Sequence, residues 1–426
     1  MIYFYLIMTK TNILLNDALV AADSDDEIII IPPTMSDEED NEGEPAGELE
    51  VFRQDEEAET STSASNWDRQ NALMFLPEGN RVAPPYESFP FLESKSPIDI
   101  FSLFYDESFK RLVIDETNRC AAQKNNHSFH IDSTDLDKFV ALSLLSGYMS
   151  LPRQRMYWCN DFDIETPIFA KSMSRDRFEE IKKYLHFANN EELATNNSFS
   201  KMQPIFDITN NNLQQFGVFS QFLSIDEQMV SYRGRHPCKQ FIRNKPVRFG
   251  YKMWMMSSSD GYPFAFQPYQ GRQAERTEPL GSSVVRNMCD IISRLSDPHN
   301  HTIVIDNFFT SYDLIDNLCN RGIRCVGVVR QNRMKSCPLK PNSQMKNRGD
   351  VDFSCDGRVF FTKWNDNNMV HCGSNFATHL PFHSTSRFIH KNLTSISMPL
   401  CIKLKLFKIF HPFRDFLYFC NKNLLY

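Results

Sequence analysis

The hydrophobic pattern of residues 220–330 constrains the fold of this chain more than any other feature of its sequence. Three apolar segments with strand-like character come first, and two helical segments then alternate with two further strands. Strands are expected over 222–230, 247–257, 263–271, 301–309 and 324–330, and helices over 282–295 and 311–322. This order predicts a mixed α/β sheet rather than two packed β-sheets.

The preceding residues, 90–215, have a helical pattern instead. Helices are expected over 96–123, 137–149 and 175–187. Thr134 and Asp137 have the spacing of a capping box at the start of the second helix. Ser174 is suited to cap the third helix, because its hydroxyl can accept a hydrogen bond from the first turn. These residues therefore predict a helical domain in front of the sheet.

The charge of the chain is divided unevenly along its length. Residues 1–59 contain seventeen acidic and two basic side chains, a net charge of −15, so residues 60–426 carry +8 of the overall −7. Acidic, Ser- and Gly-rich sequence with few large apolar residues cannot bury enough surface to fold, which predicts a disordered acidic tail over 1–66. The basic remainder suits a polyanionic partner such as nucleic acid, although ordinary surface variation explains it equally well.

Cysteine usage and the N-terminal residues bear on the cellular compartment. The eleven cysteines include no CxxC pair, and the apolar opening MIYFYLIM lacks a basic region in front of it. An odd count without a spacing pattern favours reduced thiols in a cytosolic or nuclear protein. We expect neither a signal peptide nor a membrane span, and no zinc site.

Two carboxylates stand out in the predicted sheet. Asp226 lies inside the first strand, and Asp306 ends the fourth, eighty residues later. If these strands are neighbours, both carboxylates can point to one place, where a divalent cation would relieve their repulsion. Mg²⁺ suits such a site, because it binds carboxylates, water and substrate phosphate. The alternatives are that Asp306 only caps the helix 311–322 and that Asp226 is a surface strand residue.

A stretch rich in basic and aromatic residues follows Asp226 directly. Residues 232–252 contain no acid, and the aromatic residues Tyr232, Phe241, Phe249 and Tyr251 lie between the basic ones. This composition fits phosphate contacts and base stacking, although a solvated hairpin would look the same. The candidate DNA-binding residues are Arg233, Arg235, Lys239, Arg243, Lys245, Arg248 and Lys252.

Two long segments resemble the signature of piggyBac transposases and piggyBac transposable element-derived proteins. They are SIDEQMVSYRGRHPCKQFIRNKPVRFGYKMWM and VIDNFFTSYDLIDNLCNRGIRCVGVVRQNR, which contain Asp226 and Asp306. Upstream, TNRCA, LLSGYMSLP and MSRDRFEEIKKYLHFANN resemble the helical region of the same family. The resemblance extends from about residue 90 to residue 376.

The resemblance implies an RNase H-like mixed sheet as the core of an α/β protein. The organisation it implies is a helical DNA-binding or dimerisation domain over 90–215, the transposase core over 220–330 and part of an insertion domain over 331–378. In this family three aspartates cut and rejoin DNA with Mg²⁺ or Mn²⁺, and Asp226 and Asp306 match the first two. DNA is then the partner and the nucleus the location. Excision of two transposon ends would favour a homodimer, which the sequence does not show.

The sequence departs from the family pattern in residues 379–426. The third aspartate should follow in a Gly-Gly-Val-Asp motif, but this segment contains no glycine and a single acid, Asp415. CIKLKLFKIF (401–410) alternates like a strand. Because the segment with the third aspartate is absent, we also expect the helix that closes the sheet to be missing. We therefore expect an ancestral DDD-type transposase that is catalytically incomplete. The alternatives are a domesticated DNA-binding or chromatin-associated protein without catalysis, and a protein–protein interaction module.

Overall fold

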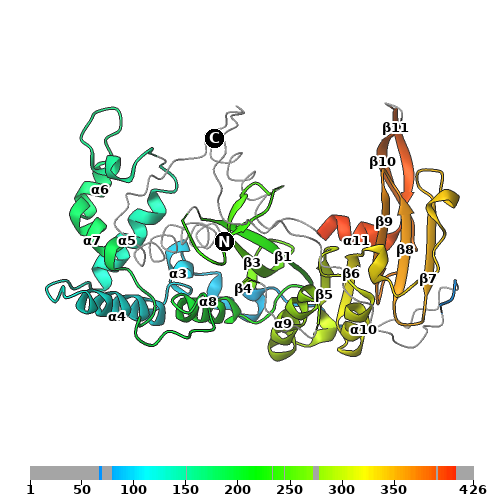
Figure 1. Ribbon diagram of the computed structural model, residues 1–426, viewed down its shortest axis with the longest axis horizontal. Helices are drawn as coiled ribbons and strands as arrows, with labels where there is room; N and C mark the ends of the chain where they lie inside the picture. Colours follow the sequence, from blue (N-terminus) through cyan, green and yellow to red (C-terminus); the bar gives the residue numbers. More distant parts are fainter. Residues whose placement is uncertain are drawn as a thin grey trace.

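The computed structural model describes residues 67–69, 79–149, 151–232, 234–243, 245–271, 278–389 and 392–408. The acidic tail predicted over 1–66 lies outside these residues. Figure 1 shows helices α4–α7 at one end of an elongated molecule, strands β1 and β3–β6 in the middle and strands β7–β11 at the other end. No helix in the described ranges is both long and apolar enough to cross a membrane.

The N-terminal part of the described chain is helical, as the sequence predicts. The expected helix over 96–123 is divided, because Asp106 accepts a hydrogen bond from the backbone of Phe109 and starts a new helix. The expected capping residue Thr134 is wrong, since the side chain of Asp132 accepts the bond from Asp135. Ser174 caps α7 as predicted. The helices are α2 (Pro85–Ser88), α3 (Pro97–Ser102), α4 (Glu107–Gln123), α5 (Ser133–Leu145), α6 (Pro167–Ser172), α7 (Arg175–Tyr184) and α8 (Gln203–Gln214).

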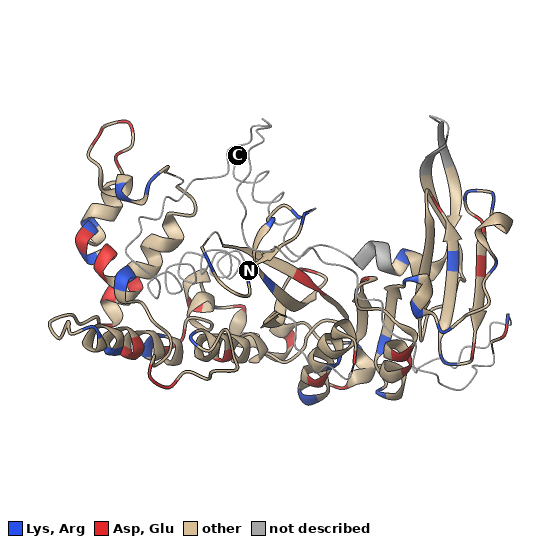
Figure 2. Ribbon diagram, in the orientation of Figure 1, with Lys and Arg blue, Asp and Glu red and all other residues tan. Residues whose placement is uncertain are grey.

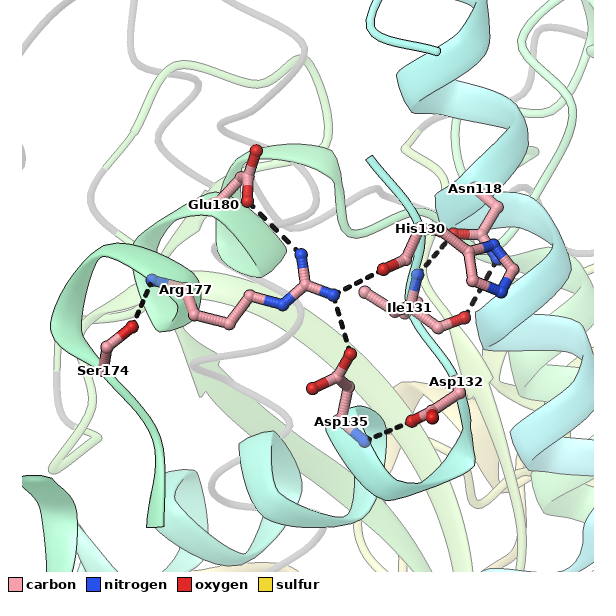
Figure 3. A network of polar contacts seen from close by, with 8 residues as sticks. All are labelled: Asn118, His130, Ile131, Asp132, Asp135, Ser174, Arg177 and Glu180. Atoms are coloured by element: carbon pink, nitrogen blue, oxygen red, sulfur yellow. Dashed lines mark hydrogen bonds and ion pairs between the residues drawn. The ribbon is translucent and has the colours of Figure 1, made fainter. Parts of the chain in front are cut away.

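A polar network joins three of these helices (Figure 3). Arg177 of α7 donates to the carboxylate of Asp135 on α5 at 2.6 Å and also to the backbone carbonyl of His130. Asn118 of α4 bonds both backbone groups of Ile131, accepting at 2.8 Å and donating at 3.1 Å. The segment between α4 and α5 is therefore held from both sides, which gives the helical domain a defined shape.

The central sheet has nine strands in the order β2-β3-β1-β5-β6-β9-β8-β7, with β4 also paired to β3. β1, β5 and β6 are parallel to one another, and β1 and β6 have antiparallel neighbours in β3 and β9. The sheet is therefore mixed, as predicted. The strands are β1 (Phe222–Ser231), β2 (Gln240–Phe241), β3 (Phe249–Ser258), β4 (Pro263–Pro268), β5 (Thr302–Ile305), β6 (Arg324–Val328), β7 (Val351–Cys355), β8 (Phe360–Asn365) and β9 (Met369–Ser374).

Helices cover both faces of the parallel part of the sheet. α9 (Leu280–Leu295) and α10 (Tyr312–Asn320) pack on the face that carries Ile303 and Ile305. Gly322 ends α10 with a positive φ of 71°, and its N–H and that of Ile323 bond the last carbonyls of the helix. This is the Schellman arrangement that glycine at the C′ position favours.

The C-terminal part of the described chain differs from expectation. A second, two-stranded sheet consists of β10 (His383–Ile389) and β11 (Asn392–Met398). The segment expected to alternate as a strand is instead a helix, α11 (Leu400–Lys408), which packs against β5, β6 and β9. Cys401 and Ile402 are buried there with Val304 and Val326. The expectation of a missing closing helix is therefore wrong, because the apolar sheet face opposite α9 and α10 favours a helix that buries it.

Candidate functional site

The fold brings Asp226 and Asp306 onto adjacent parallel strands. Ile225 of β1 and Ile305 of β5 are register partners, and each aspartate is the next residue of its chain. Neighbouring strands lie about 4.8 Å apart. Alternation along β1 places Asp226 on the face opposite α9 and α10, and Asp306 follows directly on the last residue of β5. Two aspartates separated by eighty residues of sequence are therefore neighbours in the backbone register of β1 and β5.

Asp306 is not the capping residue of the following helix. The hydroxyl of Ser311 caps α10 by accepting a hydrogen bond from the backbone of Leu314. The backbone carbonyl of Asp306 instead accepts bonds from the N–H groups of Phe309 and Thr310, at 3.0 and 3.1 Å, which forms a tight turn after β5. The Asp306 residue is exposed at this turn. Helix capping therefore does not explain its carboxylate.

Asp226 is half-buried, so it is more than a surface strand residue. Burial, and next the negative charge of Glu227, raise the pKa of Asp226 to about 7. Burial also acts on Glu227, but the charges of Lys252 and Lys245 outweigh it and lower the pKa of Glu227. The Lys245 ammonium lies 2.9 Å from the Glu227 carboxylate. Because its pKa is raised, the Asp226 carboxylate favours binding either a proton or a cation near neutral pH.

Lys252 departs from the expectation of a solvent-facing DNA contact. Its residue is only 5% exposed, and its ammonium lies 4.1 Å from the ring centre of Trp254 and 4.7 Å from that of Phe308. Burial lowers the pKa of Lys252. Lys252 and Trp254 are two residues apart on β3, so their side chains point to the same face of the sheet. Trp254 packs there in the core beneath α9 and α10. Lys252 therefore acts inside the protein, and it stabilises the charge of Glu227.

The remaining cations lie around β2, on a hairpin that Figure 2 shows with basic residues at its end. Arg235, Arg243 and Arg248 are exposed. Lys239 is half-buried and donates to the carbonyl of Gly234 at 3.1 Å. Arg233 lies outside the described residues. The arginines are therefore the predicted DNA contacts that the structure leaves at the surface.

Glu227 is a residue that the sequence reasoning missed. It links the basic hairpin to the strand of Asp226 through Lys245, and it lies on the same face as Lys252. The sequence could have indicated Glu227, because Asp226 and Glu227 are adjacent in SIDEQMV. Successive strand residues point to opposite faces, so one of the two acids had to face the core.

Comparison with known proteins identifies the family. The family described as Transposase IS4 matches residues 96–404, which is most of the chain. PiggyBac transposable element-derived protein 3 of Homo sapiens is 34% identical over 331 residues, and protein 2 of the same series, also human, is 36% identical over 318 residues. The chain belongs to the piggyBac transposase family.

The piggyBac relatives are longer than the matched region. The alignments cover 76% and 72% of this chain, but 55% and 53% of the two human proteins. The chain thus spans about half the length of the curated relatives it matches. A cryo-EM structure of a piggyBac transposase synaptic complex with hairpin DNA has a similar fold, with a TM-score of 0.61 and 22% identity. It covers 76% of this chain and 68% of that one, and it supports the RNase H-like assignment of the core.

The described part of the chain shows no further acidic side chain grouped with the two aspartates as a metal site. No cluster of three or more His, Cys, Asp or Glu side chains suited to a metal occurs there. The helix that packs on the sheet face opposite α9 and α10 is α11, whose sequence LCIKLKLFK contains lysines and no acid. The family match nevertheless reaches residue 404, inside this helix.

Proposed function

We propose that this chain is a piggyBac transposase-derived protein that binds DNA, holds one divalent cation between Asp226 and Asp306, and does not cleave DNA. The observation that carries the proposal is the register of β1 and β5, which makes the two aspartates neighbours. Two hard oxygen ligands from adjacent strands fit Mg²⁺ or Mn²⁺. Such an ion supplies charge stabilisation at a phosphate oxygen and a more acidic bound water.

The lack of an acid on α11 supports the absence of cleavage. Phosphoryl transfer by two metal ions needs ligands that bridge and flank both ions, and two aspartate side chains provide too few such ligands. The described sequence of α11 therefore offers no further carboxylate for a second cation. Asp226 and Asp306 would still position one ion, with water and a DNA phosphate completing its shell.

The exposed arginines support the DNA-binding part of the proposal. Arg235, Arg243 and Arg248 surround β2 without a nearby acid in the sequence from 232 to 252. If each neutralises one phosphate, the logarithm of the binding constant should fall against the logarithm of the salt concentration with a slope of about −2.7. Nuclear location and homodimerisation follow as expectations of this DNA role.

A second candidate function is DNA binding without any metal, in a chromatin-associated protein. The sequence of α11, which contains lysines and no acid, favours it. The two functions differ in one respect that can be measured. Metal binding at the aspartates predicts a cation-dependent signal, whereas the metal-free function predicts that EDTA changes nothing.

The test uses the purified full chain. We expect isothermal titration with Mn²⁺ to show weak binding that Asp306→Ala removes and that Asp260→Ala, in the exposed β3–β4 turn, retains. Fluorescence anisotropy should show DNA binding that weakens steeply with salt. Mn²⁺-dependent strand cleavage that Asp306→Ala abolishes would refute the absence of catalysis. DNA binding that is absent or independent of salt would refute the DNA role.

A further inference from the structure

Two phenylalanines are exposed side by side on the basic hairpin. Phe241 of β2 and Phe249 of β3 are register partners across the antiparallel pair, and their residues are 40% and 43% exposed. Their ring centres are 4.7 Å apart, with an angle of 36° between the ring planes. Directly opposed side chains lie on the same side of a strand pair, so the two rings form one continuous aromatic surface.

The other aromatic residues of this segment are not available in the same way. Tyr232 and Tyr251 are buried, and their rings contact each other 4.8 Å apart inside the core. In the sequence, all four aromatic residues lie between basic residues and could not be distinguished from one another. The structure separates them, because only the phenylalanine pair faces solvent.

Basic groups surround the exposed rings. The ammonium of Lys239 lies 5.6 Å from the ring centre of Phe249, and Arg243 and Arg248 are exposed in the loop that joins β2 to β3. The segment 232–252 contains no acid. An exposed aromatic surface surrounded only by cations suits a partner that carries both negative charge and flat aromatic faces.

The position of the rings relative to the aspartates is also defined. The backbone N–H of Tyr232 bonds the carbonyl of Phe249, so Phe249 lies opposite Tyr232, which is six positions after Asp226 in the chain. At the usual rise of a strand, six residues correspond to a distance of about 20 Å between Asp226 and the level of Phe249. The Lys245–Glu227 ion pair ties the loop to the strand that carries Asp226. In Figure 1 the hairpin end of β3 points away from α9 and α10.

We infer that Phe241 and Phe249 form a stacking platform for unpaired bases at the end of a DNA duplex. The inference rests on the proposed DNA-binding function and adds the form of DNA that the surface selects. Bases inside a duplex already stack on each other and do not offer their faces, whereas an unpaired base does. The arginines hold the phosphates, and the rings take the base.

The experiment compares two DNA probes with the full-length chain by fluorescence anisotropy. One probe is a blunt duplex, and the other is the same duplex with a short single-stranded 3′ extension containing 2-aminopurine. Wild type should bind the extended probe more tightly and change the 2-aminopurine emission. The double variant Phe241→Leu with Phe249→Leu should lose about five- to 150-fold in affinity for the extended probe. Its affinity for the blunt duplex should stay within about twofold, since leucine does not remove a cation.

The controls separate the two proposals. Replacing both phenylalanines with tryptophan should restore binding and the emission change, because the indole ring also stacks. Arg243→Gln with Arg248→Gln should weaken both probes alike. If the leucine variant binds both probes as wild type does, or loses both equally, the stacking platform is wrong while DNA binding stands. If wild type binds neither probe, the proposed function fails, and the platform fails with it.

Discussion

Replacing Ile402 with alanine tests whether α11 covers the sheet face opposite α9 and α10. Ile402 is 2% exposed and packs in one cluster with Val304 of β5 and Val326 of β6. Removing a buried isoleucine side chain down to alanine costs about 2–5 kcal/mol, from lost transfer free energy and from the cavity left behind. We expect about 3 kcal/mol here, because the helix can move only partly into the gap. In a domain of 150–250 residues this lowers Tm by about 6–12 °C.

Urea unfolding followed by tryptophan fluorescence measures this change. Trp364 reports directly, since it belongs to the same cluster and donates its indole N–H to the carbonyl of Ser397 at 2.9 Å. Leu380→Ala is the matched control, because that leucine is exposed and its loss should change the free energy of unfolding by less than about 0.5 kcal/mol. An unfolding midpoint for Ile402→Ala that equals that of wild type would show that α11 does not pack on the sheet.

Three further predictions concern stability. Ser174→Ala should cost about 1 kcal/mol, since α7 loses its N-cap, and Ser174→Asp should not; equal urea midpoints for serine and alanine would contradict this. Gly322→Ala should cost about 1–3 kcal/mol, because φ is 71° and the new Cβ would lie 2.6 Å from the imidazole of His299; unchanged stability would show that the turn can relax. Burial, and then the charge of Lys363, lower the pKa of His371 to about 4. The unfolded chain, with a pKa of about 6.5, then binds more protons, so stability falls as pH drops from about 6.5 to 4. His371→Gln should flatten this part of a pH–stability curve, and an unaltered curve would exclude His371 as its source.

Local sequence chemistry predicted the elements of the core well. Ser174 caps α7 as expected, because capping depends on neighbours within one helical turn. The misplacement of the α5 cap shows the limit of this reasoning. Asp132 and Thr134 are both suitable capping residues, and the choice between them depends on where the chain leaves the preceding turn.

Side-chain direction was the weaker part of the prediction. The basic stretch was treated as one surface, although Lys252 shares the parity of Trp254 on β3 and had to face the same side. Applying the two-residue period would have placed it inside the core. No period applies to the loop between the strands, so the exposure of Arg243 could not be deduced in this way.

By itself the sequence determined the order of strands and helices and the chemistry at their ends. Asp306 directly after a buried apolar run is a local property that the sequence shows, whereas only the structure decided that Ser311 caps the next helix. The tertiary structure alone decided that β5 lies beside β1, which joins Asp306 to Asp226. It also decided that α11 covers the sheet face opposite α9 and α10. The physical reason is that pairing of distant strands and burial of a sheet face depend on which surfaces meet, and local propensity does not encode that choice.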